Sequence, residues 1–216
     1  MVEGDDGVAP EVLRRENRVM MGFIVVAAVV FGMLLGSHFW SESIKNFEYA
    51  NISWQVEEYA EPMGSIYHGR FASLTIDDLF YNIYLRNDPR ENVVGVDGRL
   101  DDFQSIGYVA WDEEINGCKG ELSRAMYDLT AFLKQGVGVR SVGGAASSLE
   151  YANSSGMEYV DCDIEDRTIV IIGFGDESKV VKDKENKVCY TIYVEDCEDV
   201  LGIEKFMTQA VEDWNS

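Results

Sequence analysis

The sequence predicts an α+β protein: one N-terminal membrane-spanning helix, followed by an ectodomain in which two helices cover one face of a mostly antiparallel sheet. Three observations lead to this prediction. Residues 19–40 are apolar and carry no charge. Short runs between residues 65 and 194 are rich in β-branched and aromatic side chains, and residues 118–135 and 197–214 place apolar residues at helical spacing. Strands combined with a few segregated helices are typical of α+β folds.

The segment 19–40, VMMGFIVVAAVVFGMLLGSHFW, has the length and composition of a membrane span. At about 1.5 Å per residue it covers roughly 33 Å, which exceeds the hydrocarbon core of about 30 Å. A cleaved signal peptide has an apolar region of only about 7–15 residues and small residues at its cleavage site, whereas Phe39 and Trp40 end this segment. A buried helix of a soluble core is the weaker alternative, because no charge interrupts the run. We therefore expect an uncleaved signal anchor.

The charges beside the span predict its direction. Arg14, Arg15 and Arg18 form a basic cluster on the N-terminal side, and the positive-inside rule places such clusters in the cytoplasm. The chain is thus expected to consist of a cytoplasmic tail (1–18), a transmembrane helix (19–40), an amphipathic juxtamembrane segment (41–64) and an extracytoplasmic domain (65–216).

Small residues form one edge of the predicted span. Ala28, Gly32 and Gly36 are spaced four residues apart, and this spacing lets two helix backbones approach closely. The edge indicates a homodimer or docking to another membrane protein. The alternative is that Gly and Ala are simply frequent in membrane helices.

The juxtamembrane residues 41–60 are predicted to form an amphipathic helix, because Ile44, Phe47 and Trp54 fall near one helical face. Pro62 and Gly64 then end it. Asn51 and Asn153 each begin a glycosylation sequon, which fits an exported domain, although so short a motif also occurs by chance.

The domain is expected to alternate strands with two helices. Pro89 closes the second strand, Gly136 ends the first helix, and Asp196 caps the second. Residues 143–148, which have small side chains, are expected to form a loop. The predicted strands are 66–71, 80–85, 106–111, 168–174, 179–181 and 188–194, and the predicted helices are 118–135 and 197–214.

The chain is strongly acidic, with a formal net charge of −21. Such a surface repels phosphate groups, so nucleic acid is not an expected partner. Bound calcium, a basic partner or life at high salt would each explain the acidity, but a solvated surface is the simplest explanation. The acidic clusters at 77–78, 97–102 and 161–166 lack the spacing of an EF-hand loop. We expect no metal and no other cofactor.

Four cysteines, Cys118, Cys162, Cys189 and Cys197, follow the span. An even number in an oxidising compartment predicts two disulfides, with three connectivities. We favour Cys118–Cys197, because both residues begin helices that should share one sheet face, and Cys162–Cys189, which flank neighbouring strands. A zinc site is the alternative, and the absence of any CxxC pair weakens it.

No group of residues indicates a catalytic mechanism. His68 is the only histidine of the domain and no nucleophile-elbow sequence accompanies it, so a Ser-His-Asp mechanism has little support. The most distinctive local string runs from Arg86 to Arg90, RNDPR. Arg86, Asp88 and Arg90 could bind a carboxylate ligand or could form an internal salt bridge that fixes the loop, and we favour the second interpretation.

Several strings follow one another along the domain: YLRNDPR at 84–90, Cys118 opening a helix with Phe132 and Leu133 near its end, CY at 189–190, and DCE at 196–198 opening the last helix. Over residues 80–210 they resemble uncharacterised membrane-anchored proteins of archaeal genomes. The resemblance implies an archaeal cell surface and a four-cysteine ectodomain, and it implies no known activity.

Two functions follow from these predictions. The leading hypothesis is a non-enzymatic single-pass cell-surface protein whose disulfide-braced ectodomain serves binding or envelope assembly. Its expected partners are the lipid bilayer and a second copy or another membrane or envelope protein. The alternative is an envelope enzyme or solute-binding domain with a cleft lined by Arg86, Asp88, Arg90 and His68.

Overall fold

The computed structural model describes residues 10–60, 64–74 and 79–216. The chain divides into a helical unit that ends at Lys45 and a folded unit, Asn46–Ser216. In the first unit, helix α1 (Pro10–Lys45) contains an apolar stretch, Met20–Ser37, that is long enough to cross a membrane. This stretch has a mean hydropathy of 2.3, and none of it is buried. The sequence therefore predicts this helix correctly at the level of length and composition.

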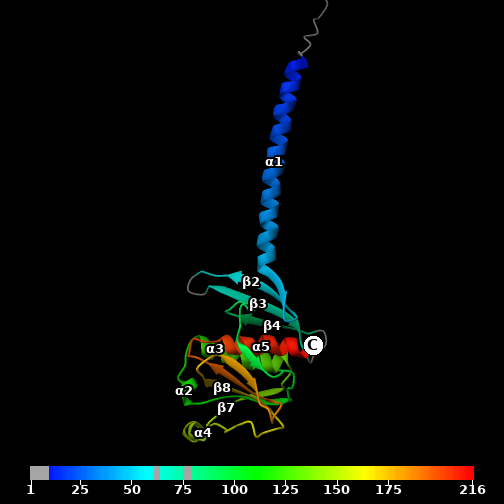
Figure 1. The fold of residues 1–216 in the computed structure, drawn as a ribbon. Coiled ribbons are helices and arrows are strands. Elements are labelled where there is room, and N and C mark those ends of the chain that lie inside the picture. Colours follow the sequence, from blue (N-terminus) through cyan, green and yellow to red (C-terminus); the bar gives the residue numbers. More distant parts are fainter. Residues whose placement is uncertain (1–9, 61–63, 75–78) are drawn as a thin grey trace, which may run out of the picture. The chain divides into compact units, whose positions relative to one another are not determined.

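The folded unit begins with an antiparallel sheet, sheet A, of four strands in sequential order. Its strands are β1 (Asn46–Tyr49), β2 (Ile52–Glu58), β3 (Ser65–Ala72) and β4 (Phe80–Leu85) (Figure 1).

The prediction of a juxtamembrane helix is therefore wrong beyond Lys45, where the chain forms strands β1 and β2. Phe47, Tyr49, Ile52 and Trp54 contribute to the core, and their spacing has a period of two along each strand, the period of a sheet. The turn between β1 and β2 has positive φ at both central residues, 53° and 58°. That conformation joins tight hairpins, and Asn51 is a residue type that tolerates it.

The second sheet, sheet B, has six strands and is mixed. Only the β9–β10 pair is antiparallel, and the other four pairings are parallel. The prediction of a mostly antiparallel sheet is wrong for this part of the chain. In spatial order the strands are β5 (Gly95–Asp97), β9 (Lys179–Lys182), β10 (Cys189–Val194), β8 (Thr168–Phe174), β6 (Ile106–Trp111) and β7 (Ser141–Ala146).

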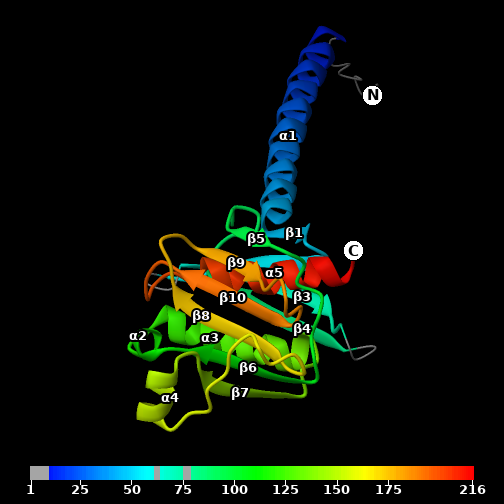
Figure 2. The ribbon, with the colours of Figure 1, turned by 60° about the horizontal axis from the view of Figure 1, so that its bottom comes forward.

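Two helices lie between the sheets (Figures 1 and 2). They are α3 (Glu121–Ala131), which continues into a π-helical turn, η1 (Phe132–Gly136), and α5 (Leu201–Trp214). Phe132 packs against Phe71 of sheet A, while Phe206 packs against Tyr190 of sheet B. The two helices thus cover one face of sheet B, as predicted, and sheet A covers their other side.

The remaining helices are short: α2 (Glu113–Asn116) and α4 (Leu149–Ser155). The far face of sheet B carries a smaller apolar cluster that includes Ile169 and Cys189. Val160 and Ile164, from the loop after α4, pack on this cluster. Sheet B is therefore covered on both faces, which explains why β8 and β10 are apolar almost throughout.

Two local predictions differ from the structure. The small residues at 143–146 belong to edge strand β7, because the rings of Tyr108 and Trp111 occupy the space above Gly143 and Gly144. The last helix begins at Leu201, four residues later than predicted. Asp196 instead accepts hydrogen bonds from the backbone N–H groups of residues 198 and 199 and holds a turn.

The core of sheet A leaves no room for a side chain at Gly69. A Cβ there would lie 2.7 Å from side-chain carbons of Trp54 and Ile83, on the two neighbouring strands. We expect Gly69→Ala to lower the free energy of unfolding by about 1–3 kcal/mol through overpacking. Urea unfolding measures the effect. Gly173→Ala in β8 is the matched control, since nothing lies within 4 Å of its Cβ position, and an equal loss in both variants would contradict this explanation.

Candidate functional site

The RNDPR turn follows β4 and lies against the helix layer. Arg86 donates from Nε and Nη2 to the carboxylate of Glu121 on α3, at 3.2 and 3.4 Å. Glu121 also accepts from Arg124, which in turn contacts Asp128 at 2.5 Å. The ion pairs form a short chain of alternating charge along α3, and their side chains are only partly exposed.

Glu204 of α5 binds the same turn through its carboxylate. The residue is 2% exposed, and its carboxylate accepts three hydrogen bonds: from the backbone N of Arg86 at 2.6 Å, and from the backbone N and Nδ2 of Asn87 at 3.2 and 3.0 Å. Burial raises the pKa of Glu204, and the donors from Arg86 and Asn87 oppose that rise. A buried carboxylate whose oxygens are satisfied by a turn is a structural clamp between sheet A and α5.

Asp88 and Arg90 close the turn on itself. The guanidinium of Arg90 donates to both oxygens of Asp88, at 2.9 and 2.6 Å, and these bonds lower the pKa of Asp88. The guanidinium also lies 3.7 Å from the ring centroid of Phe47 on β1. These contacts match the interpretation of the turn as an internal salt bridge.

His68 does not join this group. It pairs with Asn82 of β4 at 3.1 Å and stacks on Tyr84, and both neighbours are exposed. The adjacent residue, Tyr67, points to the opposite face and packs on the core, where burial, and next the nearby charge of Asp88, raise its pKa. Arg86, Asp88 and Arg90 therefore lie on the core side of sheet A, and His68 lies on the outer side, so the four residues do not line one cleft.

Both favoured disulfides are present. Cys118–Cys197 joins the segments that lead into α3 and α5, and Cys162–Cys189 joins the loop after α4 to β10. The first bond links the two helices of the middle layer, and the second fixes the loop that covers the far face of sheet B.

The other predicted residues are all at the surface. Nothing lies within 4 Å of the Cβ positions of Gly32 and Gly36, and Ala28 on the same helix is exposed. Asn51 in the hairpin turn and Asn153 in α4 are exposed as well, so both sequons are accessible. Glycosylation and helix pairing stay predictions.

The acidic clusters do not gather into a metal site within residues 10–60, 64–74 and 79–216, where no group of three or more His, Cys, Asp or Glu residues could hold an ion. The cluster at 77–78 lies outside the described residues. Other acids are engaged by neighbouring groups of the chain, as the next network illustrates.

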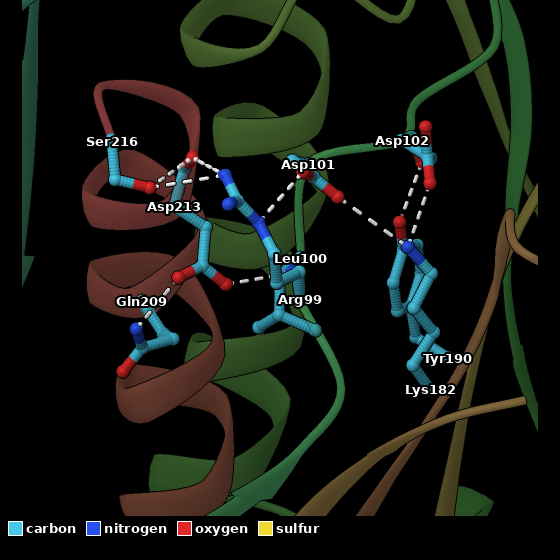
Figure 3. A network of polar contacts seen from close by, with 9 residues as sticks. All are labelled: Arg99, Leu100, Asp101, Asp102, Lys182, Tyr190, Gln209, Asp213 and Ser216. Carbon is cyan, nitrogen blue, oxygen red and sulfur yellow. Dashed lines mark hydrogen bonds and ion pairs between the residues drawn. The ribbon is translucent and has the colours of Figure 1, made fainter.

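A polar network fixes the segment 99–102 between α5 and sheet B (Figure 3). Arg99 donates to the backbone oxygen of Asp213 at 2.7 Å and pairs with Asp101 at 2.9 Å. The Asp213 carboxylate accepts from the backbone N of Leu100 at 2.7 Å. Lys182 of β9 pairs with Asp102 at 2.7 Å. We call these residues, Arg99–Asp102 with Lys182 and Asp213, the C-terminal clasp.

Neither Glu204 nor the C-terminal clasp is among the residues that the sequence predicts to be functional. A signal for Glu204 exists, because it is a charged residue among the apolar residues of α5; it is buried there, whereas the neighbouring Lys205 is partly exposed. A carboxylate in such a stretch needs buried donors, and the polar RNDPR turn is a natural source of them. The clasp gives no comparable signal, since its members are far apart in sequence.

The raised pKa of Glu204 predicts a pH effect. Its folded-state pKa lies above the ordinary value of 4.5, so its contribution to stability is full below pH 4.5 and is lost as the pH rises through the folded-state pKa. Glu204→Gln removes this titration. We expect the stability advantage of the wild type over Glu204→Gln to shrink as the pH rises above 4.5 and through the raised pKa of Glu204. Urea unfolding of both proteins at each pH measures it, and an advantage that grows with pH would contradict the raised pKa.

Comparison of this chain with protein-family models, with curated proteins and with solved structures finds no match. The chain is an α+β protein with one apolar N-terminal helix and a domain braced by two disulfides, a combination consistent with a membrane-anchored or secreted protein.

Proposed function

We propose that this chain is a single-pass cell-surface protein whose disulfide-braced domain serves binding or envelope assembly, not catalysis. The observation that carries the proposal is the combination of the fully exposed apolar stretch, Met20–Ser37, with two disulfides in the folded unit. An apolar helix of this length is long enough to cross a bilayer, and structural disulfides are typical of oxidising compartments.

The proposed orientation places residues 1–18 in the cytoplasm and the folded unit outside. It is supported by the basic cluster at 14–18. The resemblance to archaeal membrane-anchored proteins supports an archaeal cell surface as the setting. The anchor is not cleaved in this proposal, because bulky residues replace the small residues of a signal-peptidase site.

The polar groups of the RNDPR turn argue against a catalytic site there. Asp88 pairs with Arg90 inside the turn, and Glu121 and Glu204 bind Arg86, so these groups hold the fold together. A catalytic group at this place would need an accessible, unpaired acid, base or nucleophile.

Membrane topology can be tested directly. Protease is added to intact cells and to inside-out vesicles, and carbonate extraction at high pH tests integral anchoring. We expect the folded unit to be digested from outside only and the protein to stay in the membrane fraction. Release of the folded unit into the medium, or protection from external protease, would refute the proposed anchoring.

The Ala28, Gly32 and Gly36 edge is proposed to pair with a second copy or with another membrane protein. Chemical crosslinking in native membranes tests this. Gly32→Leu should abolish the crosslinked species, because a large side chain separates the backbones. Ala27→Leu, about 140° around the helix from Gly32, is the control that should preserve it. A protein that yields no crosslinked species at all would count against assembly.

A further inference from the structure

A pocket of about 390 Å³ opens in the folded unit where the helix layer meets the edge of sheet B. One wall is Phe103 and the polar pair Gln104 and Ser105, which follow the C-terminal clasp. The lining also includes Lys134 of η1, Arg140 from the turn before β7, and Trp214 at the end of α5, together with Val137 and Gly138. The volume lies within the range of about 300–1,000 Å³ that small-molecule sites occupy.

The pocket brings together two cations that no carboxylate of the described residues neutralises. Lys134 and Arg140 are exposed, and neither forms an ion pair with any residue in the described part of the chain. By contrast, the cations of the neighbouring clasp, Arg99 and Lys182, are paired with carboxylates.

Figure 3 shows the partners of the acidic residues that are close in sequence to the pocket walls. Asp101 and Asp102, which precede Phe103, contact Arg99 and Lys182. Asp213, which precedes Trp214, accepts from the backbone N of Leu100 and from Gln209. The acids closest in sequence to the pocket walls are therefore engaged elsewhere, and the positive charge of Lys134 and Arg140 is left for a ligand.

The walls of the pocket are held by backbone hydrogen bonds. The backbone N of Gln104 donates to the hydroxyl of the buried Thr168 at 2.6 Å. The backbone N of Ser141, beside Arg140, donates to the carbonyl of Ser105 at 3.3 Å. The two walls are thus joined to each other and to sheet B, so little ordering would be needed on binding.

We propose that this pocket binds an acidic sugar, meaning a pyranose ring that carries a carboxylate. Arg140 and Lys134 would bind the carboxylate, since guanidinium and ammonium groups are the usual partners of carboxylates. Trp214, a residue that is 41% exposed, would offer its aromatic ring to the C–H face of the sugar. Gln104 and Ser105 supply donors and acceptors for ring hydroxyls.

The lining favours this ligand over simpler anions. Inorganic sulfate or phosphate would leave the exposed ring of Trp214 without a contact. A fatty acid would place its apolar chain against the polar side chains of Gln104 and Ser105. A sugar acid uses the cations, the aromatic face and the polar rim together.

The inference goes beyond the proposed function, because the pocket lies wholly within the folded unit and does not depend on the anchor. It is tested on the full chain in neutral detergent micelles by calorimetric titration with glucuronate, glucose and sodium sulfate. We expect glucuronate to bind at least about tenfold more tightly than glucose or sulfate. Tenfold corresponds to about 1.4 kcal/mol, a typical value for one charged contact.

Charge-matched variants identify the site. Lys134→Gln combined with Arg140→Gln should weaken glucuronate binding at least about tenfold. Lys119→Gln combined with Lys187→Gln removes the same charge from exposed lysines outside the pocket and should leave the affinity unchanged. Circular dichroism confirms that both variants are folded. Absence of glucuronate binding, equal binding of glucose or sulfate, or equal loss in both double variants would each overturn the proposal, and none of these results would bear on the anchor.

Discussion

Replacement of both Cys118 and Cys197 by alanine should lower the free energy of unfolding by about 4.5 kcal/mol. The bond closes a loop with a sequence separation of 79 residues, and in the chain-entropy model the stabilisation grows with the logarithm of loop length. It also links the segments that lead into α3 and α5, the two helices on which both sheets pack. Urea unfolding of the wild type and the double variant measures the difference.

The second disulfide is the natural comparison for the first. Cys162–Cys189 has a sequence separation of 27, for which the same model gives about 3.5 kcal/mol. We therefore expect the double alanine variant at Cys162 and Cys189 to be the more stable of the two. The reverse order would show that loop length does not govern the contribution of these bonds.

Removal of the Glu204 carboxylate should cost about 3–5 kcal/mol. Glu204→Ala leaves the backbone N–H groups of Arg86 and Asn87 and the side-chain amide of Asn87 without their acceptor, and buried donors without partners are expensive. Glu204→Gln should fall between the wild type and Glu204→Ala, because one amide oxygen still accepts. Thermal or urea unfolding measures all three proteins.

Glu212→Ala is the matched control for the Glu204 variants. It removes the same group from the same helix at a partly exposed position and should change stability by no more than about 0.5 kcal/mol. If Glu204→Ala were as mild as Glu212→Ala, the role of Glu204 as a clamp would be refuted.

The sequence predicts elements better than it predicts pairings. The strands at 168–174 and 188–194 are evident from continuous β-branched and aromatic runs. Their arrangement is not evident: β10 lies parallel to β8, and β9 pairs with β10 on the other side. The pairing of strands depends on contacts between residues that are distant in sequence, and local composition does not indicate these contacts.

The segment 46–58 illustrates a different difficulty. Phe47 and Trp54 are seven residues apart, which places them on one face of a helix, and the same two residues lie opposite each other in the β1–β2 hairpin. Both patterns bury the same side chains. The hairpin prevails because β3 offers a full partner strand to β2, and tertiary pairing overrides local periodicity.

The polar contacts also differ in whether the sequence predicts them: local contacts are predictable, and long-range contacts are not. The bond between Asp88 and Arg90 is local, so the RNDPR string alone indicates it. The contacts of Glu204 with the turn and of Arg99 with the end of α5 join residues more than 100 positions apart. Such contacts can be found only when the fold is known, and the pocket that combines residues 103–105, 134, 140 and 214 belongs to this class.

The central claim is that one chain joins an uncleaved membrane helix to a disulfide-braced exported domain. The most direct test is the intact mass of the protein extracted from native membranes, measured without reduction after treatment with a thiol-alkylating reagent. We expect a chain of 24.3 kDa, apart from any glycan, that takes up no alkyl group until it is reduced and then takes up four. A mass that lacks the residues before the folded unit, or four thiols alkylated without reduction, would contradict the claim.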